Sequence, residues 1–120
     1  MNILLVSADP ELVNKIFPAL QYKVKGDYKI VHTAQECREL IKSGYHPNFA
    51  ICDYDVPPGN GIDVIMQIRQ KEELDNTRIL LTIEPEHYMK AKAMVTMLKA
   101  TMKEKPVGLF DLIRFLGGLN

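Results

Sequence analysis

The sequence predicts an α/β fold with a doubly wound parallel sheet, a (βα)5 arrangement that has helices on both faces. Short apolar runs with the composition of strands alternate five times with stretches in which apolar residues recur at helical spacing. Alternation of this kind gives parallel strands joined by right-handed crossovers. The length of 120 residues is that of one domain, and we expect residues 1–120 to form it.

Five segments are expected to form the strands, at residues 3–6, 28–32, 48–52, 78–83 and 100–104. The run from Ile3 to Val6 is continuously apolar, which indicates a strand covered on both faces. Residues 48–52 are also strongly apolar and are expected near the centre of the sheet, whereas residues 100–104 show the weakest pattern.

The intervening segments are expected to form helices, from Asp9 to about Leu20 and over residues 35–43, 62–73, 86–99 and 109–116. Asp9-Pro10-Glu11 is a typical helix start, because the acid caps the first turn and proline is tolerated at the first helical position. Pro18 lacks a backbone donor late in the first helix, so a kink or an early end is expected there.

Composition argues against several classes of function. Fifteen Lys and Arg residues balance fifteen Asp and Glu residues, so the zero net charge disfavours direct binding to nucleic acid or to an acidic membrane. The N-terminal apolar run is too short for a signal peptide or a membrane span, and a cytoplasmic location is expected. The three histidines lie in separate segments and no glycine-rich loop follows the first strand, so an enzyme is not expected.

In parallel sheets, ligands and reactive groups collect beyond the carboxyl ends of the strands. Here these positions are occupied by Ser7-Ala8-Asp9, Asp53-Tyr54-Asp55, Thr82-Ile83-Glu84 and Lys105-Pro106. As candidate site residues, Asp53 offers a carboxylate, Thr82 offers a hydroxyl that can donate a hydrogen bond, and Lys105 offers an ammonium charge. The alternatives are, in turn, a turn acid, a β-branched strand residue and a solvated charge.

These residues resemble the receiver domain of bacterial two-component response regulators, and the resemblance spans the whole chain. Receivers carry an aspartate at the end of the third strand, a proline four residues later and a glycine eight residues later, which Asp53, Pro57 and Gly61 match. They also carry a Thr or Ser at the end of the fourth strand, matched by Thr82, and a cis Lys-Pro pair after the fifth strand, matched by Lys105-Pro106.

The resemblance implies a flavodoxin-like strand order of 2-1-3-4-5, with Asp53 as the phosphoacceptor and with Thr82 and Lys105 as the residues that contact the phosphate and switch with it. It implies a stand-alone receiver in phosphorelay signal transduction, phosphorylated by a histidine kinase or a phosphotransfer protein, whose output passes to another protein. The alternative is a pseudo-receiver, in which the same fold is a protein-binding module that needs no phosphorylation.

The sequence departs from the receiver pattern where receivers hold Mg²⁺. Receivers follow the first strand with two adjacent acids, and Ser7 and Ala8 occupy those positions. The ligands that the resemblance still implies are Asp53, the backbone carbonyl of Asp55 and, if its side chain turns inward, Asp9. Mg²⁺ needs oxygen ligands in octahedral geometry, so we expect weak or absent Mg²⁺ binding and slow or absent phosphorylation. Asp9 could instead cap its helix, and Asp55 could supply the missing carboxylate or remain a solvated turn acid.

Receivers usually signal through the fourth helix, the fifth strand and the fifth helix, and this part of the chain is basic. Residues 87–103 contain four lysines, four methionines and no acid. The residues expected to dock an acidic partner are Lys90, Lys92, Met97, Lys99, Lys103 and Phe110. The alternative is that Ala93, Met94 and Met97 face the sheet while the lysines are solvated. Exposure of Phe110 or Phe115 would favour a binding surface or a homodimer.

Met102 stands where receivers usually have an aromatic residue that swings inward when the switch operates. Methionine is flexible and packs adaptably, so it need not act as a two-position lever. Val107 likewise replaces a common phenylalanine after the Lys-Pro pair.

Overall fold

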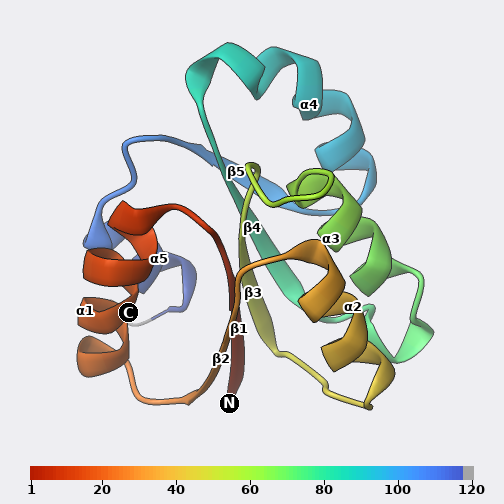
Figure 1. Cartoon of the computed structure of the whole chain (residues 1–120), viewed down its shortest axis with the longest axis horizontal. Coiled ribbons are helices and arrows are strands. Elements are labelled where there is room, and N and C mark those ends of the chain that lie inside the picture. The colour runs from red at the N-terminus through yellow and green to blue at the C-terminus, as the bar shows by residue number, and fades with distance from the viewer. Residues whose placement is uncertain (118–120) are drawn as a thin grey trace.

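The computed structural model describes residues 1–117, in which five strands form one sheet (Figure 1). The strands are β1 (Asn2–Val6), β2 (Asp27–Val31), β3 (Phe49–Asp53), β4 (Arg78–Ile83) and β5 (Thr101–Glu104). All neighbours pair in parallel in the order β2-β1-β3-β4-β5, which confirms the predicted fold class and strand order. The strand that ends in Asp53, β3, is therefore the middle strand of the sheet.

Helices cover both faces of this sheet. They are α1 (Phe17–Lys23), α2 (Ala34–Lys42), α3 (Gly61–Arg69), α4 (Pro85–Met97) and α5 (Leu109–Phe115). Figure 1 shows α1 and α5 on one side of the sheet, and α2, α3 and α4 on the other. Among the described residues, none of the helices is both long and apolar enough to span a bilayer.

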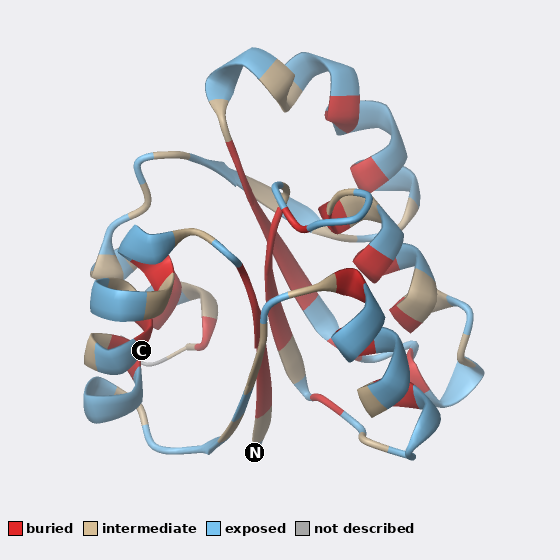
Figure 2. Ribbon diagram, viewed as in Figure 1, coloured by how far each residue is buried: buried red, intermediate tan, exposed pale blue. Residues whose placement is uncertain are grey.

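The sheet separates two hydrophobic cores, because successive strand side chains point to opposite faces. Leu4 and Val6 of β1 pack with the helices α2, α3 and α4, whereas Ile3 and Leu5 pack with α1 and α5. Figure 2 shows the inner strands as mostly buried. Burying each large aliphatic side chain contributes about 1.5–3 kcal/mol to folding, so the continuous apolar run of β1 anchors both layers.

The first helix differs from the prediction around Pro18. A π-helical turn, Leu12–Ile16, comes before α1, and the backbone N–H of Phe17 donates to the carbonyl of Leu12. Pro18 is the second residue of α1 and comes directly after this π-helical turn, so the irregular turn lies where proline disrupts regular helical hydrogen bonding. The expected early end was wrong, since the helix continues to Lys23, and the irregularity precedes the proline.

The third and fourth helices end earlier than predicted. α3 stops at Arg69 and is followed by a 3-10 turn, Glu72–Leu74, in which Leu74 is buried. The Arg69 side chain donates to the backbone carbonyls of Leu74 and Leu98, and so ties this turn to the end of α4. α4 stops at Met97, and Lys99 then adopts a left-handed backbone conformation with a φ of 58° that redirects the chain into β5.

The start of α3 packs closely against the end of β3. Asn60 caps the helix by accepting from the Ile62 N–H at 2.9 Å, and the Gly61 N–H donates to the carbonyl of Tyr54 at 2.8 Å. A β-carbon added at Gly61 would collide with the backbone carbonyl of Asp53 and with the Leu81 side chain. The receiver-like glycine is therefore required by this close approach, since any side chain would push β3 and α3 apart.

We predict that Gly61→Ala destabilises the fold by about 2 kcal/mol, the cost of overpacking where backbone must move. The matched control is Gly108→Ala at the start of α5, where the nearest atom to an added β-carbon is an Asp111 carboxylate oxygen at 3.4 Å. That substitution is expected to cost at most about 0.5 kcal/mol. Urea unfolding of both variants measures the difference, and equal losses would contradict the close-approach argument.

Candidate functional site

The structure brings Asp53, Thr82 and Lys105 together at the carboxyl ends of the strands. Asp53 and Thr82 are register partners at the ends of β3 and β4, and the Thr82 hydroxyl donates to Asp53 Oδ1 at 3.4 Å. The Lys105 Nζ lies 2.9 Å from Asp53 Oδ1 and 3.0 Å from Asp53 Oδ2. A carboxylate, a hydroxyl and an ammonium therefore share one site, with the ammonium against both carboxylate oxygens.

Asp53 is almost completely buried, with 1% of its surface exposed. Besides Lys105 and Thr82, its carboxylate accepts hydrogen bonds from the Ser7 hydroxyl at 3.2 Å and from the backbone N–H of Asp55. Burial raises the pKa of Asp53, and the Lys105 ammonium and the hydrogen bonds from Ser7 and Asp55 only partly offset that rise. The site therefore holds a desolvated carboxylate whose charge depends on its partners.

Lys105 pairs with a second carboxylate, that of Asp9, at 2.8 Å. Its side chain is 11% exposed, and Glu84 lies farther away, at 3.8 Å. Burial lowers the pKa of Lys105, but the contacts with Asp9 and Asp53 outweigh it and hold the pKa above its ordinary value. Burial also raises the pKa of Asp9, yet the contact with Lys105 and backbone N–H donors bring it below its ordinary value.

The Asp9 side chain caps its helix and also turns inward, toward Lys105 rather than toward a metal ion. Its Oδ1 accepts from the Glu11 N–H at 2.9 Å, which caps the helix start, while Oδ2 binds Lys105 at 2.8 Å. The Asp9 N–H in turn donates to the Ser7 hydroxyl at 3.0 Å. Ser7 and Glu84 were not predicted as contacts of the site, although both belong to the strand ends that the sequence singles out.

The residues present do not fit a Mg²⁺ site of the receiver kind. Ala8 offers no ligand atom, and the side-chain oxygens of Asp9 and Asp53 are already engaged by hydrogen bonds and the Lys105 ammonium. The Asp55 side chain is exposed and makes no hydrogen bond or ion pair within residues 1–117. In that same range, no three acidic, histidine or cysteine side chains are grouped so that they could hold a metal ion.

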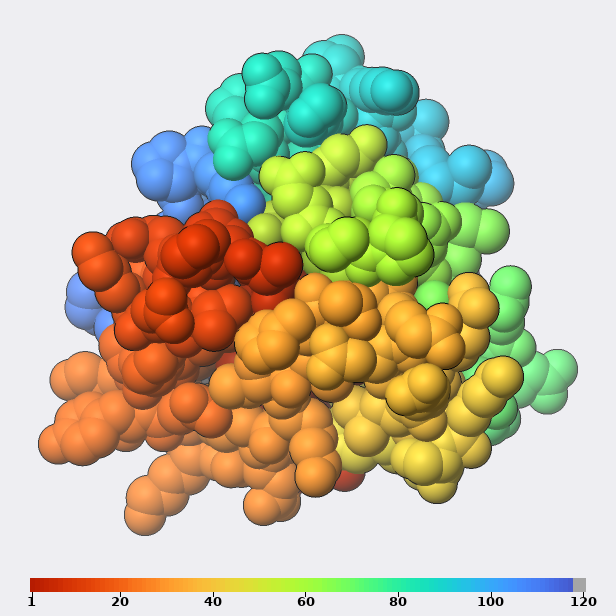
Figure 3. Space-filling view, in the orientation of Figure 1, coloured from red at the N-terminus to blue at the C-terminus, as the bar shows by residue number. Residues whose placement is uncertain are grey.

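A shallow hollow of about 310 Å³ opens over this site. Its lining residues are Ala8, Asp9, Asp53, Asp55, Glu84 and Lys105. Figure 3 shows the segments that follow β1 (red), β3 (yellow-green) and β5 (blue) meeting on one side of the molecule. The hollow is large enough to admit a phosphoryl group beside Lys105, and only its floor, Asp53, is fully buried.

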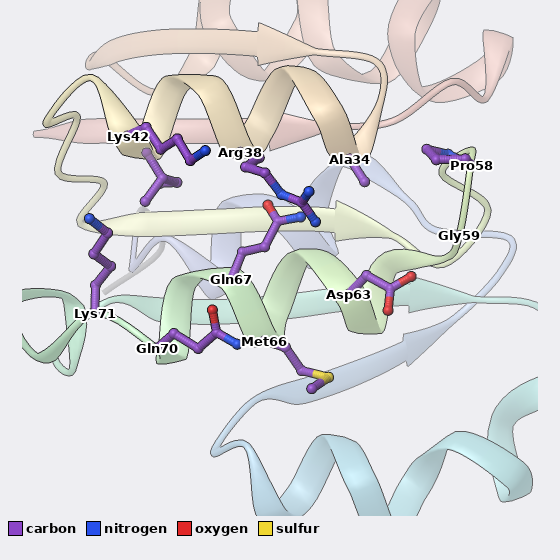
Figure 4. A pocket seen from close by; sticks show the side chains of 11 residues that line it. Ala34, Arg38, Lys42, Pro58, Gly59, Asp63, Met66, Gln67, Gln70 and Lys71 are labelled. Atoms are coloured by element: carbon purple, nitrogen blue, oxygen red, sulfur yellow. The ribbon is translucent and has the colours of Figure 1, made fainter.

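A larger hollow of about 380 Å³ lies elsewhere, between α2 and α3 (Figure 4). Arg38, Lys42 and Lys71 give it a basic lining, and the Arg38 guanidinium and the Gln67 amide point toward each other across it. The groups that line it include no strand-end carboxylate, hydroxyl or ammonium of the Asp53 site. The predicted site residues Asp53 and Lys105 line the smaller hollow instead.

The outer face of α4 carries the apolar residues that one interpretation of the sequence placed against the sheet. Met94 and Met97 are 42% and 72% exposed, and Ala93 is exposed as well. Ala91 and Val95 face the sheet in their place. The interpretation that buried Ala93, Met94 and Met97 was wrong, because Ala91 and Val95 lie one turn apart on the helix and take the inner face.

The other predicted surface residues divide between exposed and packed positions. Phe110 is 65% exposed, whereas Phe115 packs edge-to-face on Phe49 with ring centroids 5.7 Å apart. Met102 is half-buried and packs against the core between the sheet and α4. The exposed lysines of this face are Lys90, Lys92, Lys99 and Lys103.

A contact that the sequence did not reveal joins the Asp53 site to α4. Tyr54 follows Asp53, and its ring stacks on His87 in the first turn of α4, with centroids 5.1 Å apart. The Tyr54 N–H also donates to the carbonyl of Thr82 at 2.8 Å. The end of β3 is thus connected to both β4 and α4, and only tertiary structure could bring these residues together.

We predict that Lys105→Met destabilises the fold at neutral pH by about 2 kcal/mol, below the figure for a fully buried pair because water reaches Asp9. Without the ammonium, the pKa values of Asp53 and Asp9 rise, so the folded protein binds protons more tightly than the unfolded chain. The loss is therefore largest at pH 7 and shrinks as the pH falls and the carboxylates are protonated. Urea unfolding at several pH values measures it, and an unchanged loss at low pH would contradict the argument.

The control is Lys103→Met, because Lys103 is exposed and pairs with Asp111 at 3.5 Å. An exposed pair of this kind contributes about 0–1 kcal/mol, so its removal is expected to change stability little at any pH. A loss equal to that of Lys105→Met would show that removal of a surface lysine, rather than of the Asp53 partner, is responsible.

No family model and no curated protein sequence matches the chain. Solved structures do match it, among them a response regulator receiver domain protein (CheY-like) from Methanospirillum hungatei JF-1, with a TM-score of 0.82 and 18% identity, covering 98% of this chain and 91% of that one. A response regulator receiver protein from Pseudomonas putida matches with a TM-score of 0.80 and 21% identity, covering 98% and 95%.

A structure described as an adenylate cyclase from Rhodopirellula baltica also matches, with a TM-score of 0.82 and 21% identity, over 98% of this chain and 86% of that one. At these identities the matches establish a common fold and leave activity to be argued from the residues. The chain therefore has the fold of response-regulator receiver domains, as the strand-end motifs predicted.

Proposed function

We propose that the chain is a receiver module of a two-component or phosphorelay pathway, which accepts a phosphoryl group at Asp53 and transmits the signal by binding another protein. The observation that carries this proposal is the convergence on Asp53 of the Thr82 hydroxyl and the Lys105 ammonium. If Asp53 were only a turn acid, Thr82 only a strand residue and Lys105 only a solvated charge, nothing would bring the three side chains together at one buried position. These structural alternatives therefore explain the geometry poorly.

The chemistry is phosphoryl transfer from a histidine kinase or a phosphotransfer protein. An Asp53 oxygen attacks the phosphorus of a phosphohistidine, the new O–P bond forms as the P–N bond breaks, and the imidazole nitrogen keeps the electron pair. The Lys105 ammonium offsets charge on the phosphoryl oxygens, and the Thr82 hydroxyl donates to one of them. The chain is the acceptor in this reaction and turns over no substrate of its own, so we do not propose an enzyme.

Transfer is expected to be slow. Both Asp53 oxygens accept from neighbouring groups in the structure, and the attacking oxygen must first give up its hydrogen bond from Ser7 or Thr82. Ser7 and Ala8, which stand at the positions of the receiver acid pair, carry no carboxylate that could hold an additional cation. A pathway of this kind also implies a cytoplasmic location.

The proposed output surface is formed by α4, β5 and α5. It combines the exposed Met97 and Phe110 with the lysines at positions 90, 92, 99 and 103. Apolar side chains among positive charges suit a partner with an acidic, partly apolar surface, and a homodimer over the same face is the other outcome. Thr82 and the stacked pair of Tyr54 and His87 connect Asp53 with this surface.

A second function is favoured by one specific observation. Ser7 replaces an acid and donates to Asp53, so the resting site is already satisfied without phosphate or metal. This arrangement suits a pseudo-receiver, a protein-binding module that uses the fold without phosphorylation. The two proposals share the output surface and differ in whether Asp53 reacts.

We predict that the wild-type chain, incubated with a small acyl or amido phosphate, gains one phosphoryl group and that Asp53→Asn gains none. Thr82→Ala is expected to keep the modification, because the hydroxyl contacts the acceptor at 3.4 Å but does not react. Mass spectrometry of the intact protein, with peptide mapping, measures the result. A wild-type chain that stays unmodified with and without Mg²⁺ would leave the pseudo-receiver as the function.

We predict that phosphorylation shifts the backbone amide resonances of α4 and β5, and that Thr82→Ala removes most of these shifts while the phosphoryl group remains. The reason is that Thr82 contacts Asp53 and lies in β4, the strand that leads into α4. Thr101→Ala is the matched control, because its hydroxyl donates to the Ile79 carbonyl, away from Asp53. Shifts confined to residues around Asp53 would mean that this surface does not respond.

A further inference from the structure

The Asp53 site lacks the receiver acid pair but contains a cation held by two carboxylates. The Lys105 ammonium lies 2.8 Å from Asp9 Oδ2, 2.9 Å from Asp53 Oδ1 and 3.0 Å from Asp53 Oδ2. Asp9 follows β1 and Asp53 ends β3, so one ammonium links two different strand ends. The acid that receivers place earlier stands here at the third position after the strand, directed at Lys105 rather than at a metal ion.

We propose that Lys105 is the built-in cation of this site, and that Asp9 is the positioning residue that holds its ammonium against Asp53, so that phosphoryl acceptance is independent of a divalent ion. This inference rests on the proposed phosphoacceptor function of Asp53. It adds a role for Asp9 and a metal-independent mode of operation, neither of which follows from the fold.

Asp9 is suited to this role because it is held at two other points. Its Oδ1 accepts from the Glu11 N–H at 2.9 Å, and its own N–H donates to the Ser7 hydroxyl at 3.0 Å. The Ser7 hydroxyl donates in turn to Asp53 at 3.2 Å. Asp9 is thus fixed relative to Asp53, and its other carboxylate oxygen, Oδ2, accepts from the Lys105 ammonium.

The ammonium has as many close acceptor oxygens as it has protons. An ammonium carries three N–H donors, and three carboxylate oxygens lie within 3.0 Å of Lys105 Nζ. The side chain is 11% exposed, so these contacts are weakly screened by water. Asp9 accepts one hydrogen bond from the ammonium and, together with Asp53, fixes the position of the ammonium group.

A divalent ion would have to displace this arrangement. Mg²⁺ dehydrates reluctantly and needs several oxygen ligands, while Ala8 supplies none and the oxygens of Asp9 and Asp53 are occupied. Glu84 is the third carboxylate near Lys105, but it lies at 3.8 Å and is 41% exposed, so water screens its charge. The carboxylates that remain free face solvent and do not replace the missing acid pair.

The first test measures the rate of Asp53 phosphorylation by a small acyl phosphate, in EDTA and in millimolar Mg²⁺. The wild-type rate is expected to change by less than about two-fold with Mg²⁺, and Asp9→Asn is expected to lower the rate in EDTA about ten-fold through loss of one charge-assisted hydrogen bond. Glu11→Gln is the matched control, because it removes a carboxylate two residues away that pairs with Lys15. It should stay within about two-fold of the wild type.

A gain-of-function variant separates positioning from general loss of structure. In Ala8→Asp combined with Asp9→Asn, an acid returns to the receiver position and the lysine is released, so Mg²⁺ should accelerate phosphorylation at least about ten-fold. A wild-type rate that requires Mg²⁺, or an Asp9→Asn rate equal to that of Glu11→Gln, would overturn the proposal.

A second readout keeps the two proposals distinguishable, because it needs no phosphorylation. The rate at which a small acylating reagent modifies Lys105, followed by peptide mass spectrometry, should rise about ten-fold in Asp9→Asn and stay unchanged in Glu11→Gln, since a paired ammonium is protected. An unphosphorylated wild type with this acylation pattern would reject the phosphoacceptor function but retain the positioning of Lys105 by Asp9. Equal acylation in all three proteins would reject that positioning role.

Discussion

The structure depends on compensation of one charge, the Asp53 carboxylate buried at the end of the middle strand. An ionised carboxylate taken out of water costs several kcal/mol unless cations and hydrogen-bond donors replace the solvent. Lys105, Ser7, Thr82 and the Asp55 N–H supply that replacement. These groups follow or end different strands, so compensation is available only when the sheet has assembled in its observed order.

Strand order and side-chain length together explain how Lys105 reaches Asp53. β4 lies between β3 and β5, so the lysine must cross a strand, and the short Thr82 side chain at the end of β4 leaves room for it. The Lys105 N–H donates to the carbonyl of Ile83 at 2.8 Å, which fixes its backbone. Gly61 packs closely against the backbone carbonyl of Asp53, which fixes the end of the strand that carries this carboxylate.

Periodicity and strand-end position predicted the sheet and the meeting of Asp53 with Lys105, because these depend on local pattern and on a general rule for parallel sheets. The strand order was implied by the resemblance to receivers. Other features depend on which tertiary partner is nearest, which pattern does not contain. Helical spacing did not decide between Met97 and Val95 for the inner face of α4. The hydroxyl of Ser7 was counted as a lost ligand, whereas the fold makes it a donor to Asp53.

The ion pairs at this site also set the conditions for a switch. A phosphoryl group on Asp53 adds acceptor oxygens near Lys105, whose three donors are already matched by oxygens of Asp9 and Asp53. The ammonium can bind phosphate fully only by giving up one of those partners, and Asp9 is the one that does not carry the phosphate. Because Asp9 also caps the helix that follows β1, a change at Asp53 would reach that helix as well as α4. In the proposed receiver, phosphorylation of Asp53 would thus affect two elements on opposite faces of the sheet.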